Sequence, residues 1–380
     1  MKRYLHSNII DDLKEKIVLV SGPRQAGKTT LSKMLVTDYE YLNYDYAPQR
    51  LKIREQSWDR TKKLLILDEV HKMPSWKQFI KGIYDVEGLS LPILVTGSAR
   101  LDTIKKVGDS LAGRYFQYRL HPFDIKELKN HFDPKEILNR LLSIGGFPEP
   151  FLKNSKAFYN RWKNTHLDII LRQDLIDLES VRDIQGIELL IELLKSRVGT
   201  PVSYSSLARD LQKNHNTVKK WLALLENLYV IFPVRPWHKN IARAILKEPK
   251  YYFYDTGQIL ADESIRLENV VATALLKEIH FLEDTTGCKA SLHYVRNKQG
   301  YEIDFAVSIN KVVTHFIEVK LSDTNLSKSF GVLLNEDKSA KRIQLVKNTR
   351  EEKTYPSGAE VREVSHFLAN LKLEPVATIR

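Results

Sequence analysis

The chain has 380 residues, of which 43% are hydrophobic and 28% are charged, as in ordinary globular proteins, and this length favours two or three domains over one. A formal net charge of +12 favours a polyanionic partner. The one cysteine, Cys288, excludes an internal disulfide framework, and the apolar runs at 17–20 and 64–67 are too short to cross a bilayer, so we expect a cytoplasmic protein with no membrane segment.

A glycine-bracketed loop follows the first apolar run. Residues 17–20 read Ile-Val-Leu-Val, residues 22–29 contain G-x-x-x-x-G-K-T, and helical spacing follows. A buried strand, this loop and a helix start are the context that a phosphate-binding loop requires. Gly22 and Gly27 permit backbone angles that turn N–H groups toward an anion, and the helix start adds its unsatisfied amides. The alternative, a glycine-rich turn before an ordinary helix, is disfavoured by the Lys-Thr pair in register.

The loop residues receive separate roles in a predicted site for ATP and Mg²⁺. Lys28 would reach the β- and γ-phosphates, and Thr29 would hold the metal. The predicted nucleotide contacts are Gly22, Pro23, Arg24, Gln25, Ala26, Gly27, Lys28, Thr29 and Thr30.

Two carboxylates end the next apolar run, which covers 64–67. Four apolar residues without alternation favour a parallel strand that is buried on both faces. Open α/β sheets place ligands at the carboxyl ends of such strands. We therefore expect Asp68 to hold Mg²⁺ through water and Glu69 to act as general base on the attacking water.

A third apolar strand is predicted over 91–98 and ends in hydroxyl side chains. Thr96 or Ser98 would orient the attacking water, or Ser98 would cap the helix expected from Leu101. Arg114 follows a glycine at the end of that helix. It is either a finger offered to the nucleotide of a neighbouring subunit or a cation that stabilises the helix C-terminus.

Together these motifs resemble the AAA+-type P-loop ATPases, and more narrowly the prokaryotic group that joins an AAA-like core to a C-terminal domain of the DUF4143 type. The resemblance implies ATP binding, hydrolysis and Mg²⁺. Many AAA+ members carry Asn at the position of Ser98, so this chain departs from the family pattern at a residue that would orient the attacking water. The residues that carry the resemblance are the loop at 22–29, Leu67-Asp68-Glu69, Thr96-Gly97-Ser98, Leu111-Ala112-Gly113-Arg114 and the run 252–257.

The middle of the chain is predicted to be helical. A long apolar stripe over 155–181 suits a helical lid, in which Arg161 or Arg172 would sense the γ-phosphate. Two short helices around the polar turn 212–215, followed by a β-like run at 229–232, favour a winged helix-turn-helix. Its second helix would expose Asn216, Lys219 and Lys220 toward DNA, next to a basic segment over 235–247; a structural spacer or a protein contact is the alternative.

The last part combines one long helix with paired strands. Glu268 lies in the helical pattern 263–281, Asp304 in an alternating strand, and Glu318 and Lys320 on one face of the next strand. Carboxylates from two strands suit Mg²⁺, with Lys320 orienting water. The arrangement resembles the PD-(D/E)-x-K nuclease fold, which implies metal-dependent DNA cleavage. The alternatives are a scaffold that binds without cutting and charges that only line a sheet edge.

We therefore expect an α/β protein in four parts. These are an AAA-like P-loop ATPase core with a parallel sheet (1–150), a helical lid (151–200), a winged helix-turn-helix (201–260) and a mixed α/β nuclease-like, DUF4143-type domain (261–380). The leading hypothesis is ATP hydrolysis coupled to DNA binding. An ATP-gated nuclease and a nucleotide-switched adaptor for a protein partner are the alternatives, and a homo-oligomer would let Arg114 act on a neighbour.

Overall fold

The computed structural model describes residues 1–88, 90–98, 111–174, 183–237, 247–297, 299–322, 325–333, 340–349 and 351–374. Two compact units make up the chain: Met1–Pro122, His166–Ser180 and Asn227–Tyr229 form the first, and Phe123–Thr165, Val181–Glu226 and Val230–Arg380 form the second. The helix expected from Leu101, the far end of the lid stripe and most of the predicted basic segment at 235–247 lie outside the described residues. The finer division into four parts stays a prediction.

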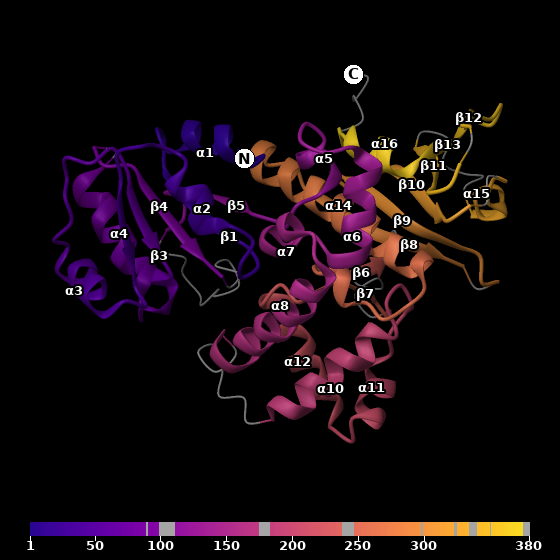
Figure 1. Cartoon of the computed structure of the whole chain (residues 1–380), viewed down its shortest axis with the longest axis horizontal. Helices are drawn as coiled ribbons and strands as arrows, with labels where there is room; N and C mark the ends of the chain where they lie inside the picture. The colour runs from indigo at the N-terminus through magenta and orange to yellow at the C-terminus, as the bar shows by residue number, and fades with distance from the viewer. Residues whose placement is uncertain are drawn as a thin grey trace. The chain divides into compact units, whose positions relative to one another are not determined.

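The first unit contains a five-stranded parallel sheet in the order β2-β3-β4-β1-β5 (Figure 1). Every residue of β1, β3 and β4 is buried, as the unbroken apolar runs predict for strands covered on both faces. Because all strands are parallel, their carboxyl ends meet at one edge, where Asp68 pairs in register with Thr96. The strands are β1 (Ile17–Ser21), β2 (Glu40–Asn43), β3 (Leu65–Asp68), β4 (Ile93–Gly97) and β5 (Tyr115–Arg119).

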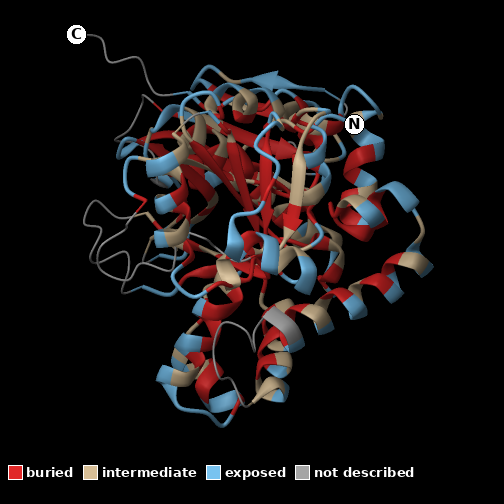
Figure 2. Ribbon diagram, turned by 90° about the vertical axis from the view of Figure 1, so that its left-hand side faces the viewer, coloured by how far each residue is buried: buried red, intermediate tan, exposed pale blue. Residues whose placement is uncertain are grey.

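Short helices connect these strands and contribute to one apolar core. Trp76, Ile80 and Ile83 lie on one face of α4 and are buried against the sheet, each contributing about 1.5–3 kcal/mol by removal from water. Figure 2 shows the contrast between buried strands and helices with one exposed face. The helices are α1 (His6–Asp12), α2 (Lys28–Lys33), α3 (Ala47–Glu55), η1 (Val70–Lys72) and α4 (Trp76–Glu87).

The second unit is built on an eight-stranded mixed sheet in the order β12-β13-β11-β10-β9-β8-β6-β7. Strands β8, β9 and β10 form an antiparallel meander, and β11 then pairs parallel to β10. The strands are β6 (Ile231–Pro236), β7 (Lys250–Phe253), β8 (Ala290–Arg296), β9 (Glu302–Ile309), β10 (Val312–Lys320), β11 (Lys341–Val346), β12 (Lys353–Thr354) and β13 (Ala359–Glu363).

Several helices of the second unit begin at a side-chain cap, and α6 is an example. Asp133 accepts from the amides of Lys135 and Glu136 ahead of α6, and Pro134 occupies the first helical position. The helices are α5 (Ile125–Leu128), α6 (Pro134–Ile144), α7 (Pro148–Lys153), α10 (Ile184–Lys195), α11 (Tyr204–Asp210), α12 (His215–Asn227), η3 (Thr256–Gln258), α14 (Glu263–Thr286), α15 (Lys328–Leu333) and α16 (Val364–Ala369). The boundary between the units, after residue 165, lies within α8 (Lys156–Ile169), and η2 (Ile170–Asp174) belongs to the first unit.

One expectation about the middle of the chain needs correction. The β-like run at 229–232 was expected to belong to a separate part ending at 260. Instead β6 pairs with β7 and, in parallel, with β8, so both strands extend the sheet of the last part. The reason is that β6 has a strand on each side, β7 and β8, whereas β7 lies at the edge of the sheet, and strand order of this kind follows from packing and not from local sequence. Among the described helices, none is long and apolar enough to cross a membrane.

Candidate nucleotide site

The loop after β1 has the backbone that its glycines predict. Gly22 has φ 152° and Gly27 has φ 93°, and Gln25 also adopts a positive φ of 62°. A Cβ atom at position 22 would lie 2.2 Å from the carbonyl oxygen of Leu120, so a side chain cannot be accommodated there. The loop therefore lies directly against the chain that follows β5.

Lys28 is buried, and its ammonium lies inside the loop. Nζ donates to the carbonyl oxygens of Gly22 and Pro23 at 2.9 and 2.7 Å. The loop residues are thereby folded around one positive charge at the start of α2. The contact of Lys28 with phosphate oxygens stays a prediction.

Asp68 lies at the centre of the polar groups at the carboxyl edge of the sheet. Oδ2 accepts from the hydroxyls of Thr29 at 3.0 Å and Tyr41 at 2.6 Å, and Oδ1 accepts from Thr96 at 2.5 Å. Thr29 and Asp68 were predicted together as metal ligands, and the fold brings them into contact. A hydroxyl and a carboxylate are oxygen donors of the kind Mg²⁺ prefers, so these residues fit the ion.

Tyr41 was not among the predicted site residues. Its hydroxyl is within hydrogen-bond distance of Asp68, and Lys33 Nζ lies 4.0 Å from the centre of its ring. Burial, with the hydrogen bond to Asp68 and its negative charge, raises the pKa of Tyr41 above its usual value, so the hydroxyl remains a donor. No local signal marks this residue, because its role comes from the pairing of β2 with β3.

Glu69 follows Asp68 in a left-handed conformation with φ 57°, and its amide donates to the carbonyl oxygen of Thr96 at 2.9 Å. Burial raises the pKa of Glu69 to about 7; the charge of Lys28 opposes this rise and that of Asp68 adds to it. A carboxyl group with a pKa near neutrality is matched to the role of general base. Ser98 Oγ lies 3.5 Å from Glu69 Oε2, so the two residues predicted for water activation are neighbours.

Arg114 lies away from these groups. Its Nε donates to Asp85 Oδ1 at 2.8 Å, and its amide donates to the carbonyl oxygen of Leu111. The guanidinium is thus paired within its own chain in this conformation. Its action on a neighbouring subunit stays a prediction.

Three residues distant in sequence contact the loop or the end of β1 before it, and sequence reasoning missed them. Arg3 is buried and donates to the carbonyl oxygens of Ala26 and His121, both at 2.6 Å. The His166 ring lies 3.1 Å from the carbonyl oxygen of Arg24, and Tyr229 donates to Ser21 Oγ at 3.0 Å. No local pattern could have marked these three residues, because each contacts a segment far from it along the chain.

The carboxylates predicted in the last part occupy the second unit. Asp304 Oδ2 accepts from the amide of Val319 at 2.8 Å, which joins β9 to β10. Glu318 and Lys320 share one face of β10, as predicted, with Nζ 2.9 Å from Oε1. Burial is the largest cause that raises the pKa of Glu318 to about 7, and the charge of Asp304 adds to it.

Glu268 is held by residues that were not predicted. Tyr252 donates to its Oε1 at 2.6 Å, and Lys250 Nζ lies 3.5 Å from the same oxygen. Within the described ranges, no group of three or more His, Cys, Asp or Glu side chains is arranged to hold a metal ion. The ligand set of Glu268, Asp304 and Glu318 therefore stays a prediction that this conformation does not support.

The residues predicted to contact DNA are on the surface. Asn216, Lys219 and Lys220 lie on the N-terminal half of α12, whose opposite face buries Val218, Trp221 and Leu222; all three polar side chains are exposed. α11 and α12 are separated by the short turn that was expected. The sequence pattern thus predicted that these three side chains are exposed, and their contact with DNA stays a prediction.

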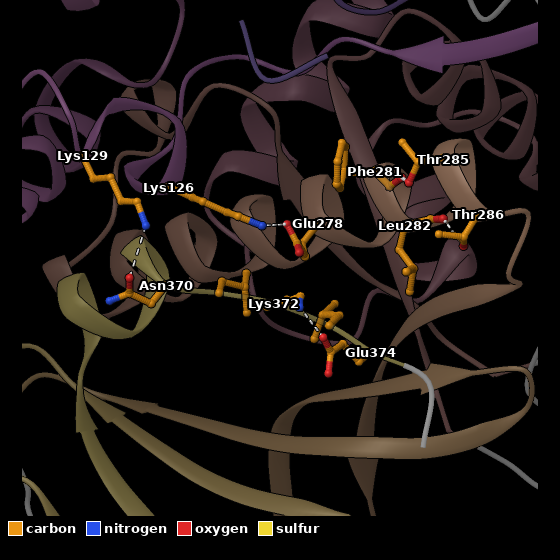
Figure 3. A pocket seen from close by; sticks show the side chains of 12 residues that line it. Lys126, Lys129, Glu278, Phe281, Leu282, Thr285, Thr286, Asn370, Lys372 and Glu374 are labelled. Carbon is orange, nitrogen blue, oxygen red and sulfur yellow. Dashed lines mark hydrogen bonds and ion pairs between the residues drawn. The ribbon is translucent and has the colours of Figure 1, made fainter. Parts of the chain in front are cut away.

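A cavity of about 630 Å³ lies elsewhere in the second unit, between α5, α14 and the segment after α16 (Figure 3). Lys126 pairs with Glu278 at 2.6 Å and Lys129 donates to Asn370 at 3.2 Å along its wall. Phe281 and Leu282 contribute an apolar surface. None of the predicted site residues lines this cavity.

Comparison with protein families agrees with the geometry of the first unit. Residues 14–129 match the family described as "AAA domain", and this segment contains the loop, Asp68, Glu69 and Ser98. This part of the chain is therefore similar to AAA-type nucleotide-binding ATPases. Residues 135–266 match "Domain of unknown function (DUF8612)", so the expected resemblance to the DUF4143 type is not confirmed.

Relatives that match most of this chain occur in bacteria and archaea. The uncharacterized protein Rv2008c of Mycobacterium tuberculosis is 26% identical over 339 residues, covering 87% of this chain and 74% of the relative. The uncharacterized protein MJ1544 of Methanocaldococcus jannaschii is 25% identical over 335 residues, covering 78% and 73%.

Two solved structures are similar in part. A single-residue variant of RuvB from Thermotoga maritima has a TM-score of 0.33 at 16% identity and covers 60% of this chain and 86% of its own. The STAND protein PH0952 of Pyrococcus horikoshii, which has a tetratricopeptide repeat sensor, has a TM-score of 0.30 at 14% identity and covers 73% and 46%. Because both TM-scores are below 0.5, no property is transferred from these structures.

Proposed function

We propose that this protein binds ATP with Mg²⁺ at the loop of its first unit and hydrolyses it. One observation carries the proposal: the loop folded around Lys28 and the acidic pair Asp68-Glu69 meet at the same edge of a parallel sheet. Phosphoryl transfer to water needs positioning and charge neutralisation more than covalent chemistry, and these groups supply both. The AAA-type similarity of residues 14–129 supports the same activity.

Each residue has one task in the proposed reaction. Lys28 neutralises oxygens of the β- and γ-phosphates, and Thr29 with Asp68 would hold Mg²⁺. When bound, the ion supplies charge neutralisation on the phosphates. Glu69 accepts a proton from the attacking water, and Ser98 beside it orients that carboxylate or the water.

The test separates binding from turnover. Lys28→Ala should reduce ATP binding below detection in a nucleotide titration. Glu69→Gln should keep the affinity and lower kcat by about 10²–10⁴-fold, the usual contribution of a general base. Lys14→Ala is the matched control, because Lys14 is an exposed lysine paired with Asp11. Unchanged ATP affinity in Lys28→Ala would refute the loop assignment.

We further propose that ATP hydrolysis is coupled to DNA. The support is the helix pair α11–α12 with Asn216, Lys219 and Lys220 exposed, together with the net charge of +12. On this proposal α11 and α12 act as a helix-turn-helix in the cytoplasm. A closed ring that uses Arg114 in trans is not needed for this activity.

DNA binding has a characteristic salt signature. Replacing both Lys219 and Lys220 by Ala should weaken DNA affinity and make the slope of log K against log salt shallower by about 2, one for each lost phosphate contact. Lys135→Ala removes an exposed lysine outside α12 and should change neither. An unaltered slope in the double variant would favour the alternative, a nucleotide-switched adaptor whose partner is a protein.

A further inference from the structure

A lysine lies buried among the carboxylates of the second unit. Lys250, the first residue of β7, is 1% exposed. Its Nζ lies 2.6 Å from Glu302 Oε1 and 3.5 Å from Glu268 Oε1. The same ammonium lies 5.3 Å from the centre of the Tyr294 ring. A buried ammonium persists only when opposite charges and hydrogen-bond acceptors surround it, and this one has both.

The neighbouring elements direct these groups toward one another. Lys250 comes from β7, Glu268 from α14, and Glu302 and Asp304 from β9. Burial lowers the pKa of Lys250, but the charges of Glu268, Asp304 and Glu302 outweigh it and the pKa stays above its usual value. The ammonium therefore lies among carboxylates, of which the sequence predicted Glu268 and Asp304, but not Glu302, as metal ligands.

The remaining members of the predicted set have other partners. Lys320 pairs with Glu318, and the amide of Val319 donates to Asp304. Glu268 Oε1 already accepts from Tyr252. The described residues contain no group of three or more His, Cys, Asp or Glu side chains disposed around a common point for a metal.

We propose that the ammonium of Lys250 takes the place of a divalent cation in this cluster of the second unit, so that Glu268, Glu302 and Asp304 hold no metal ion. A divalent ion among Glu268, Glu302 and Asp304 would have to displace an ammonium that already contacts two of them, or lie beside it against like-charge repulsion. This inference is independent of the nucleotide site.

The experiment measures Mn²⁺ binding to the full chain without nucleotide, from the signal of free Mn²⁺ in electron paramagnetic resonance. Lys250→Met should bind Mn²⁺ at least about 10-fold more tightly than the wild type, because the variant lacks the positive charge that repels the ion. Lys247→Met removes an exposed lysine three positions earlier and should leave binding unchanged. Adding Asp304→Asn to Lys250→Met should abolish the new site.

Thermal unfolding gives a second readout. Mn²⁺ should raise the Tm of Lys250→Met and not that of the wild type, because the metal then replaces the lost positive charge. If Lys250→Met does not fold, Lys250→Gln serves in both assays, since its amide still donates to Glu302. Wild-type Mn²⁺ binding that Asp304→Asn removes would overturn the inference. So would a folded Lys250 variant that gains no binding.

Discussion

Arg3 shows how a single residue stabilises the nucleotide loop from a distance. Its two terminal nitrogens each donate to a backbone carbonyl oxygen, one in the loop at Ala26 and one at His121. The side chain is buried, so loss of the guanidinium would leave two carbonyl groups without their donor. The loop is therefore fixed by a residue 23 positions away as well as by its own glycines.

We predict that Arg3→Ala lowers the free energy of unfolding by about 3 kcal/mol and weakens ATP binding, because charged hydrogen bonds contribute about 1.5–3 kcal/mol each. Arg3→Lys should restore part of both, since one ammonium reaches one carbonyl. Denaturant unfolding and nucleotide titration measure these effects. Lys2→Ala, at an exposed neighbour, is the control, and equal stability of the Arg3 and Lys2 variants would contradict the assignment.

Glu69 predicts the pH dependence of ATP hydrolysis. Its pKa is raised to about 7, so the carboxyl group holds a proton below that pH and cannot accept one from water. The value of kcat/KM should therefore rise with pH through about 7, because this parameter reports groups of the free enzyme. A pH–rate profile that is flat across neutrality would exclude Glu69 as the base.

At the scale of elements, α14 is attached to the sheet by a buried asparagine. Asn269 is 0% exposed and accepts from the amide of Phe253 at 2.8 Å. Its Nδ2 donates to the carbonyl oxygen of Phe253 and to Thr256 Oγ1. One side chain thus supplies hydrogen-bond partners to the backbone of Phe253 at the end of β7 and to Thr256 at the start of η3. Among the described strands, none other than β6 lies beside β7.

We predict that Asn269→Leu destabilises the second unit by about 2–4 kcal/mol, because buried backbone groups that lose their partners each cost about 1–3 kcal/mol. Ser264→Ala, at an exposed position of the same helix, should change stability by less than about 0.5 kcal/mol. Thermal and denaturant unfolding test the difference. A Leu variant as stable as the wild type would show that the helix is held by its apolar contacts alone.

At the scale of the whole molecule, the residues predicted for ATP hydrolysis and the carboxylates predicted for a second metal site lie in different units. Lys28, Asp68 and Glu69 all lie in the first unit, and Lys250 and Asp304 lie in the second together with Glu318. A nucleotide bound in the first unit stabilises the residues that contact it directly. Nucleotide binding should therefore have a local signature in the chain.

We predict that ATP protects amide hydrogens from exchange most strongly over 17–30, 65–71 and 93–98. At ATP about a hundredfold above Kd, the stabilisation should be about 2.7 kcal/mol. Hydrogen exchange followed by mass spectrometry measures both. Lys28→Ala should show no protection at the same ATP concentration. Protection centred on α14 or β9 in the wild type would place the nucleotide in the other unit.

The sequence by itself determined the features that depend on contiguous residues. The loop at 22–29 could be predicted because its glycines and Lys28 act through neighbouring backbone, and the observed φ angles agree. Unbroken apolar runs indicated the buried parallel strands. The position of Asp68 and Glu69 at the carboxyl edge of the sheet, beside the loop, could be predicted because a parallel sheet brings the ends of such strands together. The alternation of side chains along a strand likewise placed Glu318 and Lys320 on one face of β10.

Only the tertiary structure decided the contacts between residues that are far apart along the chain. Arg3 reaches Ala26, Tyr41 reaches Asp68, and Lys250 reaches Glu302, and no local pattern encodes these contacts. The sheet that joins β6 and β7 to β8 was missed for the same reason, since strand order depends on packing. Sequence shows a charged residue without its surroundings, and its role as ligand, base or counter-ion depends on which other groups the fold places beside it.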